Sequence, residues 1–229
     1  MVLPYVERVL WDVAQVDATL LRFPRPIDEI ITFCYPLAIQ EVAALDAKRA
    51  HAEISKLGGV SADPPDHNHK LAGYLFMRDD AGVILVEGRD SGEGRKRFTK
   101  AHELGHFVLQ VLQKREERAA TPDLFAPHQA TRRFFRSECT SEDLTRLGPT
   151  SREDWLAEAR ANYFAAELLM PADEITVQLR QVAGLRVPPS GEELIATLSR
   201  HFDVSRAAME VRLGDLQAIP AGSSQGNLC

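Results

Sequence analysis

Two histidines four residues apart are the first sign of chemistry in this sequence. They lie in the segment FTKAHELGHFV, residues 98–108, as His102 and His106. In an α-helix, side chains at this spacing share one face with their Cβ atoms about 5–6 Å apart, so both imidazoles can reach one zinc ion. Glu103 can then activate a water molecule as general base. The alternative is a chance match, which has a frequency of about one per cent in such a chain.

A catalytic zinc site needs a third protein ligand and one open position. Residue 112, where the metzincin pattern has its third histidine, is leucine. The downstream candidates are Asp123, His128, Glu138, Glu142, Glu153, Glu158 and Glu167. We favour Glu158, because it falls on the apolar face of a predicted helix over residues 151–170, where an unpaired carboxylate would be unfavourable. The other members of this face are Trp155, Ala161, Ala165, Leu168 and Leu169.

Asn162, one turn after Glu158, is a candidate hydrogen-bond partner for a metal ligand. Two alternatives stay open. Glu158 could point outward and pair with a cation such as Arg160, and His128 could be the third ligand.

The helices and strands that position these residues are predicted from the periodicity of apolar residues and from the glycines and prolines that end such elements. Two short strands, LAGYLFM and GVILVEG, form a predicted hairpin over residues 71–88. The active-site helix follows over residues 95–113, and Gly105 allows another backbone to approach it closely, at about 1 kcal/mol of helix propensity. Its core-facing stripe is Phe98, Ala101, Leu104, Val108 and Val111. Helical spacing is also predicted at residues 4–22, 36–57, 172–184, 192–202 and 205–217, and a loop at residues 57–70.

The bulk composition is that of an ordinary globular protein. The chain has 229 residues, 45% of them hydrophobic, and a net charge of −6, which gives no general basis for binding nucleic acid. Three widely spaced cysteines make no disulfide framework. We find no signal peptide and no apolar run long enough to cross a membrane, and we therefore expect a cytoplasmic protein without a membrane partner.

The segment 115–150 is polar and long for a compact domain. It carries Arg132, Arg133, Phe134 and Arg136, which could dock a substrate or form a lid. The alternative is a solvated loop with anchoring aromatics. Cys139 could also occupy the fourth zinc position as a thiolate.

The C-terminal part has the spacing of a helix-turn-helix pair over residues 186–219, followed by a flexible tail at 220–229. Leu198, Phe202, Val204 and Met209 are its predicted core positions. As a DNA reader, its second helix would present Arg206, Glu210 and Arg212, a mixed set without surplus positive charge. The sequence allows DNA binding, but it favours packing of the pair on the domain formed by residues 1–185.

The segments RFTKAHELGHFVLQ and EARANYFAAELLMP together resemble the ImmA/IrrE family of zinc metallopeptidases. The resemblance covers about residues 71–113 and 151–175. It implies His102, His106 and Glu158 as zinc ligands and Glu103 as general base and acid. It also implies a substrate, namely a helix-turn-helix repressor that is cut to release stress-response or mobile-element genes.

These observations predict a mostly helical α+β fold, with a small sheet packed on the active-site helix. We expect one zinc ion per chain, with manganese as an alternative, and an endopeptidase that cleaves a repressor. The competing hypothesis is a zinc-containing regulatory protein that binds DNA or a repressor without proteolysis.

Overall fold

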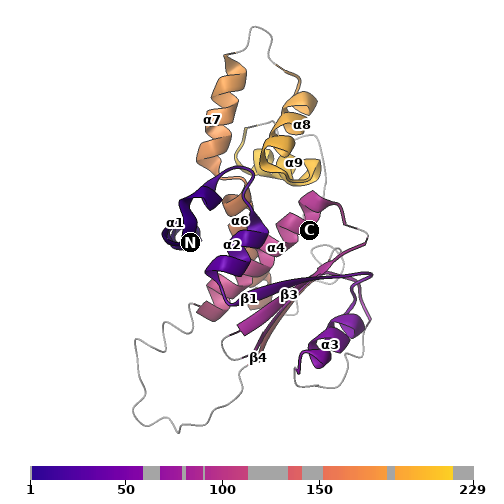
Figure 1. Ribbon diagram of the computed structural model, residues 1–229. Coiled ribbons are helices and arrows are strands. Elements are labelled where there is room, and N and C mark those ends of the chain that lie inside the picture. The colour runs from indigo at the N-terminus through magenta and orange to yellow at the C-terminus, as the bar shows by residue number, and fades with distance from the viewer. Residues whose placement is uncertain are drawn as a thin grey trace.

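A small mixed sheet has most of the helices on one side and a single helix, labelled α3, on the other (Figure 1). The computed structural model describes residues 2–58, 68–78, 81–89, 91–112, 134–140, 152–184 and 189–218. The α-helices are α1 (Leu3–Asp17), α2 (Ile27–Cys34), α3 (Ala47–Lys56), α4 (Glu93–His106), α6 (Arg152–Leu169), α7 (Ala172–Ala183), α8 (Gly191–Phe202) and α9 (Arg206–Asp215). A 3-10 helix η1 (Ala18–Leu21) follows α1, and a π-helix η2 (Phe107–Leu112) continues α4. The predicted fold class is confirmed.

The sheet contains β1 (Leu37–Val42), β2 (Leu71–Arg78), β3 (Ala81–Glu87) and β4 (Phe134–Thr140), in the order β1-β3-β2-β4. Strands β2 and β3 form the predicted hairpin, with Leu75 opposite Ile84. Strand β4 pairs antiparallel with β2, whereas β1 runs parallel to β3.

The prediction of one helix over residues 36–57 is wrong for its first half. Residues 37–42 form β1, and only the second half, from Ala47, is helical. The apolar residues of this segment fit a helical spacing equally well, but the parallel partner β3, which is distant in sequence, decides the outcome. The turn between β1 and α3 is held by the Glu87 carboxylate, which accepts hydrogen bonds from the backbone amides of Ala44 and Leu45.

The predicted loop 115–150 contains the strand β4, which the sequence analysis missed. Its residues FFRSECT lack a clean alternation of apolar and polar side chains. Pairing with β2 provides the backbone hydrogen bonds that stabilise it.

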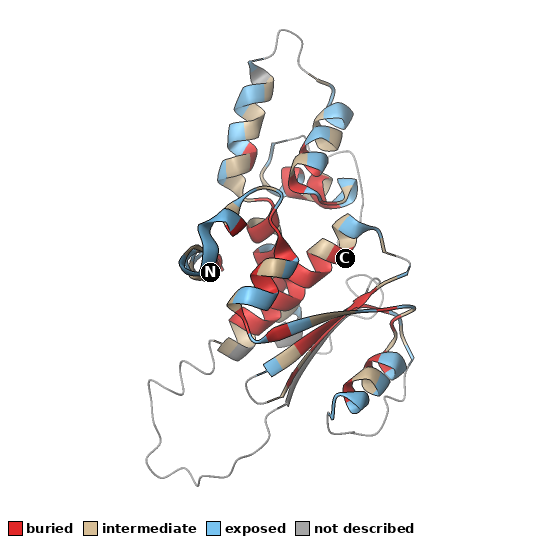
Figure 2. Ribbon diagram, viewed as in Figure 1, coloured by how far each residue is buried: buried red, intermediate tan, exposed pale blue. Residues whose placement is uncertain are grey.

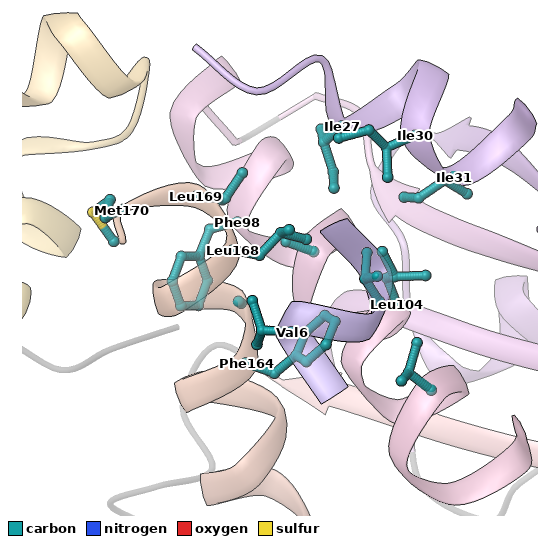
Figure 3. Packing of buried hydrophobic residues seen from close by; sticks show 14 of the residues in the cluster. Val6, Ile27, Ile30, Ile31, Phe98, Leu104, Phe164, Leu168, Leu169 and Met170 are labelled. Atoms are coloured by element: carbon teal, nitrogen blue, oxygen red, sulfur yellow. The ribbon is translucent and has the colours of Figure 1, made fainter. Parts of the chain in front are cut away.

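Each face of the hairpin strands packs on a separate core, which explains their nearly continuous apolar runs. Ile84 and Val86 point to the larger core, formed with the helices, while Val83 and Leu85 point to a smaller core under α3. The larger core contains α4, whose middle is buried (Figure 2). Figure 3 shows how side chains of α2, α4 and α6 meet there.

Two lysines attach the first half of α4 to its neighbours. Lys100 Nζ lies 2.8–2.9 Å from both carboxylate oxygens of Asp28 in α2. Lys96 Nζ lies 2.8 Å from Glu41 Oε2 in β1. Both lysines are buried, so these pairs fix the orientation of α4 before it reaches the histidines.

Helices α7, α8 and α9 gather at one end of the molecule, with α3 at the other (Figure 1). Ser190 and Ser205 cap α8 and α9. The predicted core positions of the pair are buried and belong to the larger core, which includes Phe202 and Met209. The position of a domain boundary between residues 185 and 186 stays a prediction.

Candidate metal centre

Two buried imidazoles face each other on α4. The residues His102 and His106 are each 1% exposed, and their Nε2 atoms lie 3.0 Å apart. Ala101 and Leu104, on the adjacent face of the helix, are fully buried in the core. The histidines therefore have little freedom to turn away from each other.

Glu158 reaches the same point from α6. Its Oε2 lies 3.2 Å from His102 Nε2, and its Oε1 lies 3.2 Å from His106 Nε2. The helices cross closely here, because a Cβ on Gly105 would lie only 3.2 Å from the Cα of Ala161. Gly105 lies between the two histidines and Ala161 one turn after Glu158, so this close crossing brings the carboxylate to the imidazoles.

The spacing of the three ligand atoms fits a zinc ion. A tetrahedral ion with bonds of about 2.0–2.1 Å holds its ligand atoms about 3.3 Å apart. The two Nε2 atoms lie 3.0 Å apart, and each lies 3.2 Å from one of the two carboxylate oxygens of Glu158. Two imidazoles and one carboxylate also form a ligand set known from catalytic zinc sites. In the described part of the chain, these three residues are the one group with the composition and spacing of a metal site.

Asn162 holds the first histidine from behind. Its Oδ1 lies 2.8 Å from His102 Nδ1. An amide oxygen accepts a hydrogen bond only from a protonated ring nitrogen, so Nδ1 carries a proton, and in the neutral ring Nε2 keeps its lone pair. This is the tautomer that can bind a metal through Nε2.

Burial and hydrogen bonding set the charges of the cluster. Burial acts to raise the pKa of Glu158, but the hydrogen bonds and charges of the two imidazoles outweigh it and lower this pKa to about 2. Burial lowers the pKa of His106. The carboxylate is therefore ionised and His106 is neutral near pH 7, which are the forms that bind a metal.

Glu103 lies against a glycine of the sheet. Its side chain is fully buried, and a Cβ on Gly73 in β2 would lie 2.7 Å from its Oε1. Gly73 was not among the predicted site residues, although an isolated glycine in a strand is a signal for close approach of another group. The absence of a side chain at Gly73 provides the space that the Glu103 carboxylate needs.

Several other residues considered in the sequence analysis do not lie at the metal centre or are outside the described residues. Trp155 was predicted to be buried on the face of Glu158, but it is 47% exposed, because α6 extends beyond the core at its N-terminal end. Glu167 contacts Arg212 and not the histidines. Asp123, His128, Arg132, Arg133 and Glu142 lie outside the described residues, as do the side chains of Phe134, Arg136, Glu138, Cys139 and Glu153. A lid or docking role of the 115–150 segment stays a prediction.

The comparison with protein families adds to this geometry. Residues 60–138 match the family described as the IrrE N-terminal-like domain, Peptidase M78. This part of the chain is therefore similar to an IrrE N-terminal-like domain. The resemblance to the ImmA/IrrE family is thereby confirmed. The matched segment contains His102, Glu103 and His106 and ends before Glu158.

The matched family is of metallopeptidase type and is generally zinc-dependent, and a peptidase family implies a protein as substrate. No curated protein matches the chain. Among the helices that the structure describes, none has the length and apolar character needed to cross a membrane.

Proposed function

We propose that this protein is a zinc-dependent endopeptidase. The observation that supports this proposal best is the meeting of His102, His106 and Glu158, whose nitrogen and oxygen atoms lie 3.0–3.2 Å apart. Both histidines lie in the segment that matches the IrrE N-terminal-like domain. Glu103 lies between the two histidines in sequence and is fully buried. A glutamate at this position of a His-Glu-x-x-His motif can act as general base.

A zinc ion bound by these three side chains would polarise the substrate carbonyl and lower the pKa of a water molecule. In the proposed mechanism, Glu103 accepts a proton from the attacking water and later donates it to the leaving amine. The burial of Glu103 keeps bulk water from competing for this proton. Asn162 keeps His102 in the required tautomer.

As substrate we propose a helix-turn-helix transcriptional repressor, whose cleavage would relieve repression. This part of the proposal rests on the family resemblance. The competing role, DNA binding by the helix pair, has less support. Arg212 is 3% exposed and bonded to Glu167, and Arg206 pairs with Glu192. Neither guanidinium is therefore presented as a free contact for a phosphate or a base.

The test uses the wild type and the variant Glu103→Gln, both loaded with zinc. Each is incubated with a lysate of the source cells, and new protein N-termini are identified by mass spectrometry. We expect one or a few cleavage events in the wild type and a loss of rate by about 100-fold or more in Glu103→Gln. Zinc content should be equal in the two proteins. Equal cleavage by both would reject Glu103 as the base.

A protein that displaces a repressor without cutting it predicts a different result. Neither form would then create new N-termini, while both would release a repressor from its DNA. Zinc analysis of His102→Ala and Glu158→Ala separates a failure of the metal site from a failure of the enzymatic proposal.

A further inference from the structure

A cavity of about 250 Å³ lies between α4, α6 and α9. Its lining includes Phe98, Asn162, Tyr163, Met170, Val211 and Arg212. Phe98 and Met170, which Figure 3 labels, are 7% and 1% exposed and give the cavity a buried apolar wall. Three alanines complete much of the remaining surface.

The charges around the cavity disfavour an ionic ligand. The Arg212 guanidinium already bonds the Glu167 carboxylate, and its Nε lies 3.0 Å from the carbonyl oxygen of Met170. Its positive charge is therefore compensated. Asp215, the other charged lining residue, is exposed. The ligand that fits such a lining is uncharged and largely apolar.

One polar group gives the cavity a specific contact. The Oδ1 of Asn162 is engaged by His102. That is the one hydrogen bond of this amide within the described residues, and because Asn162 lines the cavity, its amino group is available as a donor to a ligand there. A ligand with one acceptor atom would complete it.

The volume indicates the size of the ligand. A cavity of about 150 Å³ holds one benzene molecule. At about 250 Å³, the present cavity exceeds the requirement of a single ring, and two fused rings match it better. A single apolar side chain of a protein partner would fill it less completely.

The cavity is lined by Asn162, which contacts His102 Nδ1, and by none of the three candidate metal ligands. His102 directs Nε2 toward Glu158 and Nδ1 toward Asn162. These nitrogens lie on different edges of the imidazole, so a ligand beside Asn162 would leave the fourth coordination position of a metal free. Its effect on the site would pass through the Asn162–His102 hydrogen bond.

We propose that this cavity binds a small, uncharged, largely apolar ligand of about two fused rings, and that this binding regulates the metal affinity of the site through Asn162. The second part rests on the proposed function. The first part does not, since it concerns the cavity of the metal-free protein as well.

The first experiment measures binding of 2-naphthol, which has two fused rings and one hydroxyl group, by fluorescence titration of the full chain. Val211→Trp places a large side chain in the cavity and should weaken binding by about tenfold or more. Val177→Trp is the matched control, because Val177 is 43% exposed on α7 and does not line the cavity. Saturable binding that Val211→Trp leaves unchanged would place the ligand elsewhere and overturn the proposal.

The second experiment compares the affinity for 2-naphthol with and without zinc. If 2-naphthol changes the affinity for zinc, thermodynamic linkage requires that zinc changes the affinity for 2-naphthol by the same factor. A factor of about five or more is typical of such coupling. Asn162→Ala removes the proposed donor and should weaken 2-naphthol binding, and the affinity that remains should no longer differ between the two states. Equal affinities in the two states of the wild type would overturn the regulatory part.

If 2-naphthol shows no saturable binding up to about 1 mM, the proposed class of ligand is wrong. An apolar side chain of a protein partner would then be the better candidate for the cavity. A wild type that binds 2-naphthol but no zinc would instead refute the proposed function and leave the ligand site standing. The two failures are therefore distinguishable.

Discussion

Helix α6 holds two glutamates in buried polar contacts, and their partners differ in kind. Glu158 faces the imidazoles of His102 and His106, whereas Glu167, nine residues later, faces the guanidinium of Arg212. An arginine keeps its charge at any pH of interest, so the Glu167 pair is complete as it stands. Neutral imidazoles offer lone pairs, and the Glu158 cluster therefore gains most when a cation joins it.

The difference shows how one helix combines a structural and a chemical role. The Arg212 guanidinium connects α9 to the end of α6, because it also contacts the Met170 carbonyl. The Glu158 cluster connects α4 to the start of α6. If this distinction is right, variants in the two clusters should affect different measurements.

The largest effect is expected for Arg212→Ala. Removing one partner of a buried ion pair leaves the other without compensation and typically costs about 3–5 kcal/mol of unfolding free energy. Urea denaturation measures this loss, and zinc content of the folded protein should not change. Arg206→Ala is the control, since its pair with Glu192 is exposed and is worth about 0–1 kcal/mol. Similar losses in both variants would contradict a structural role for Arg212.

Glu158→Gln should have the opposite effect: a large loss of zinc affinity and a small change in stability. The amide preserves shape but removes the anionic ligand, so zinc affinity should fall by more than about 100-fold. The unfolding free energy of the metal-free protein should change by about 1 kcal/mol or less. The matched variant Glu167→Gln is expected to keep zinc and lose stability. Zinc retained by Glu158→Gln would move the third ligand to another residue.

A smaller effect is expected for Asn162→Ala. Loss of a hydrogen-bond partner behind a metal ligand lowers metal affinity by about 10–100-fold. Competition with a chromophoric chelator measures this. Asn162→Asp offers the His102 ring an acceptor again and should restore affinity, whereas a purely steric role would leave both variants equally weak.

The smallest effect concerns the helix crossing that brings the Glu158 cluster together. Gly105→Ala adds a methyl group 3.2 Å from the Ala161 Cα. Overpacking costs about 1–3 kcal/mol, and better helix propensity returns about 1 kcal/mol. We expect a net loss of up to about 2 kcal/mol in thermal or urea unfolding.

Gly214→Ala in α9 is the control for Gly105→Ala. No atom lies within 4 Å of a Cβ at Gly214. This variant should therefore show the gain in propensity alone, about 1 kcal/mol. A gain in unfolding free energy in both variants would show that the crossing of α4 and α6 can adjust to the added methyl group.

Local signals in the sequence were sufficient for much of the site. The spacing of His102 and His106 and the alanine-rich face of α6 predicted which side chains would meet, because helix periodicity is a local property. The same reasoning misplaced Trp155, since periodicity does not reveal where a helix leaves the core.

Features that depend on distant partners could not be predicted. Strands β1 and β4 form through pairing with β3 and β2, and their own sequences are ambiguous. The burial of Arg212 likewise depends on Glu167, 45 residues away in sequence. The space at Gly73 for Glu103 needed knowledge of which helix crosses the strand.

The position of Glu158 has a thermodynamic consequence for the chain as a whole. It lies 52 residues after His106, on a different helix. A metal held by both would act as a reversible cross-link between these helices, comparable to a disulfide. Closing a loop of that length removes about 4 kcal/mol of chain entropy from the unfolded state if the link persists there. Because a metal leaves unfolded chains more readily than a disulfide does, resistance to unfolding would instead follow the free concentration of the metal.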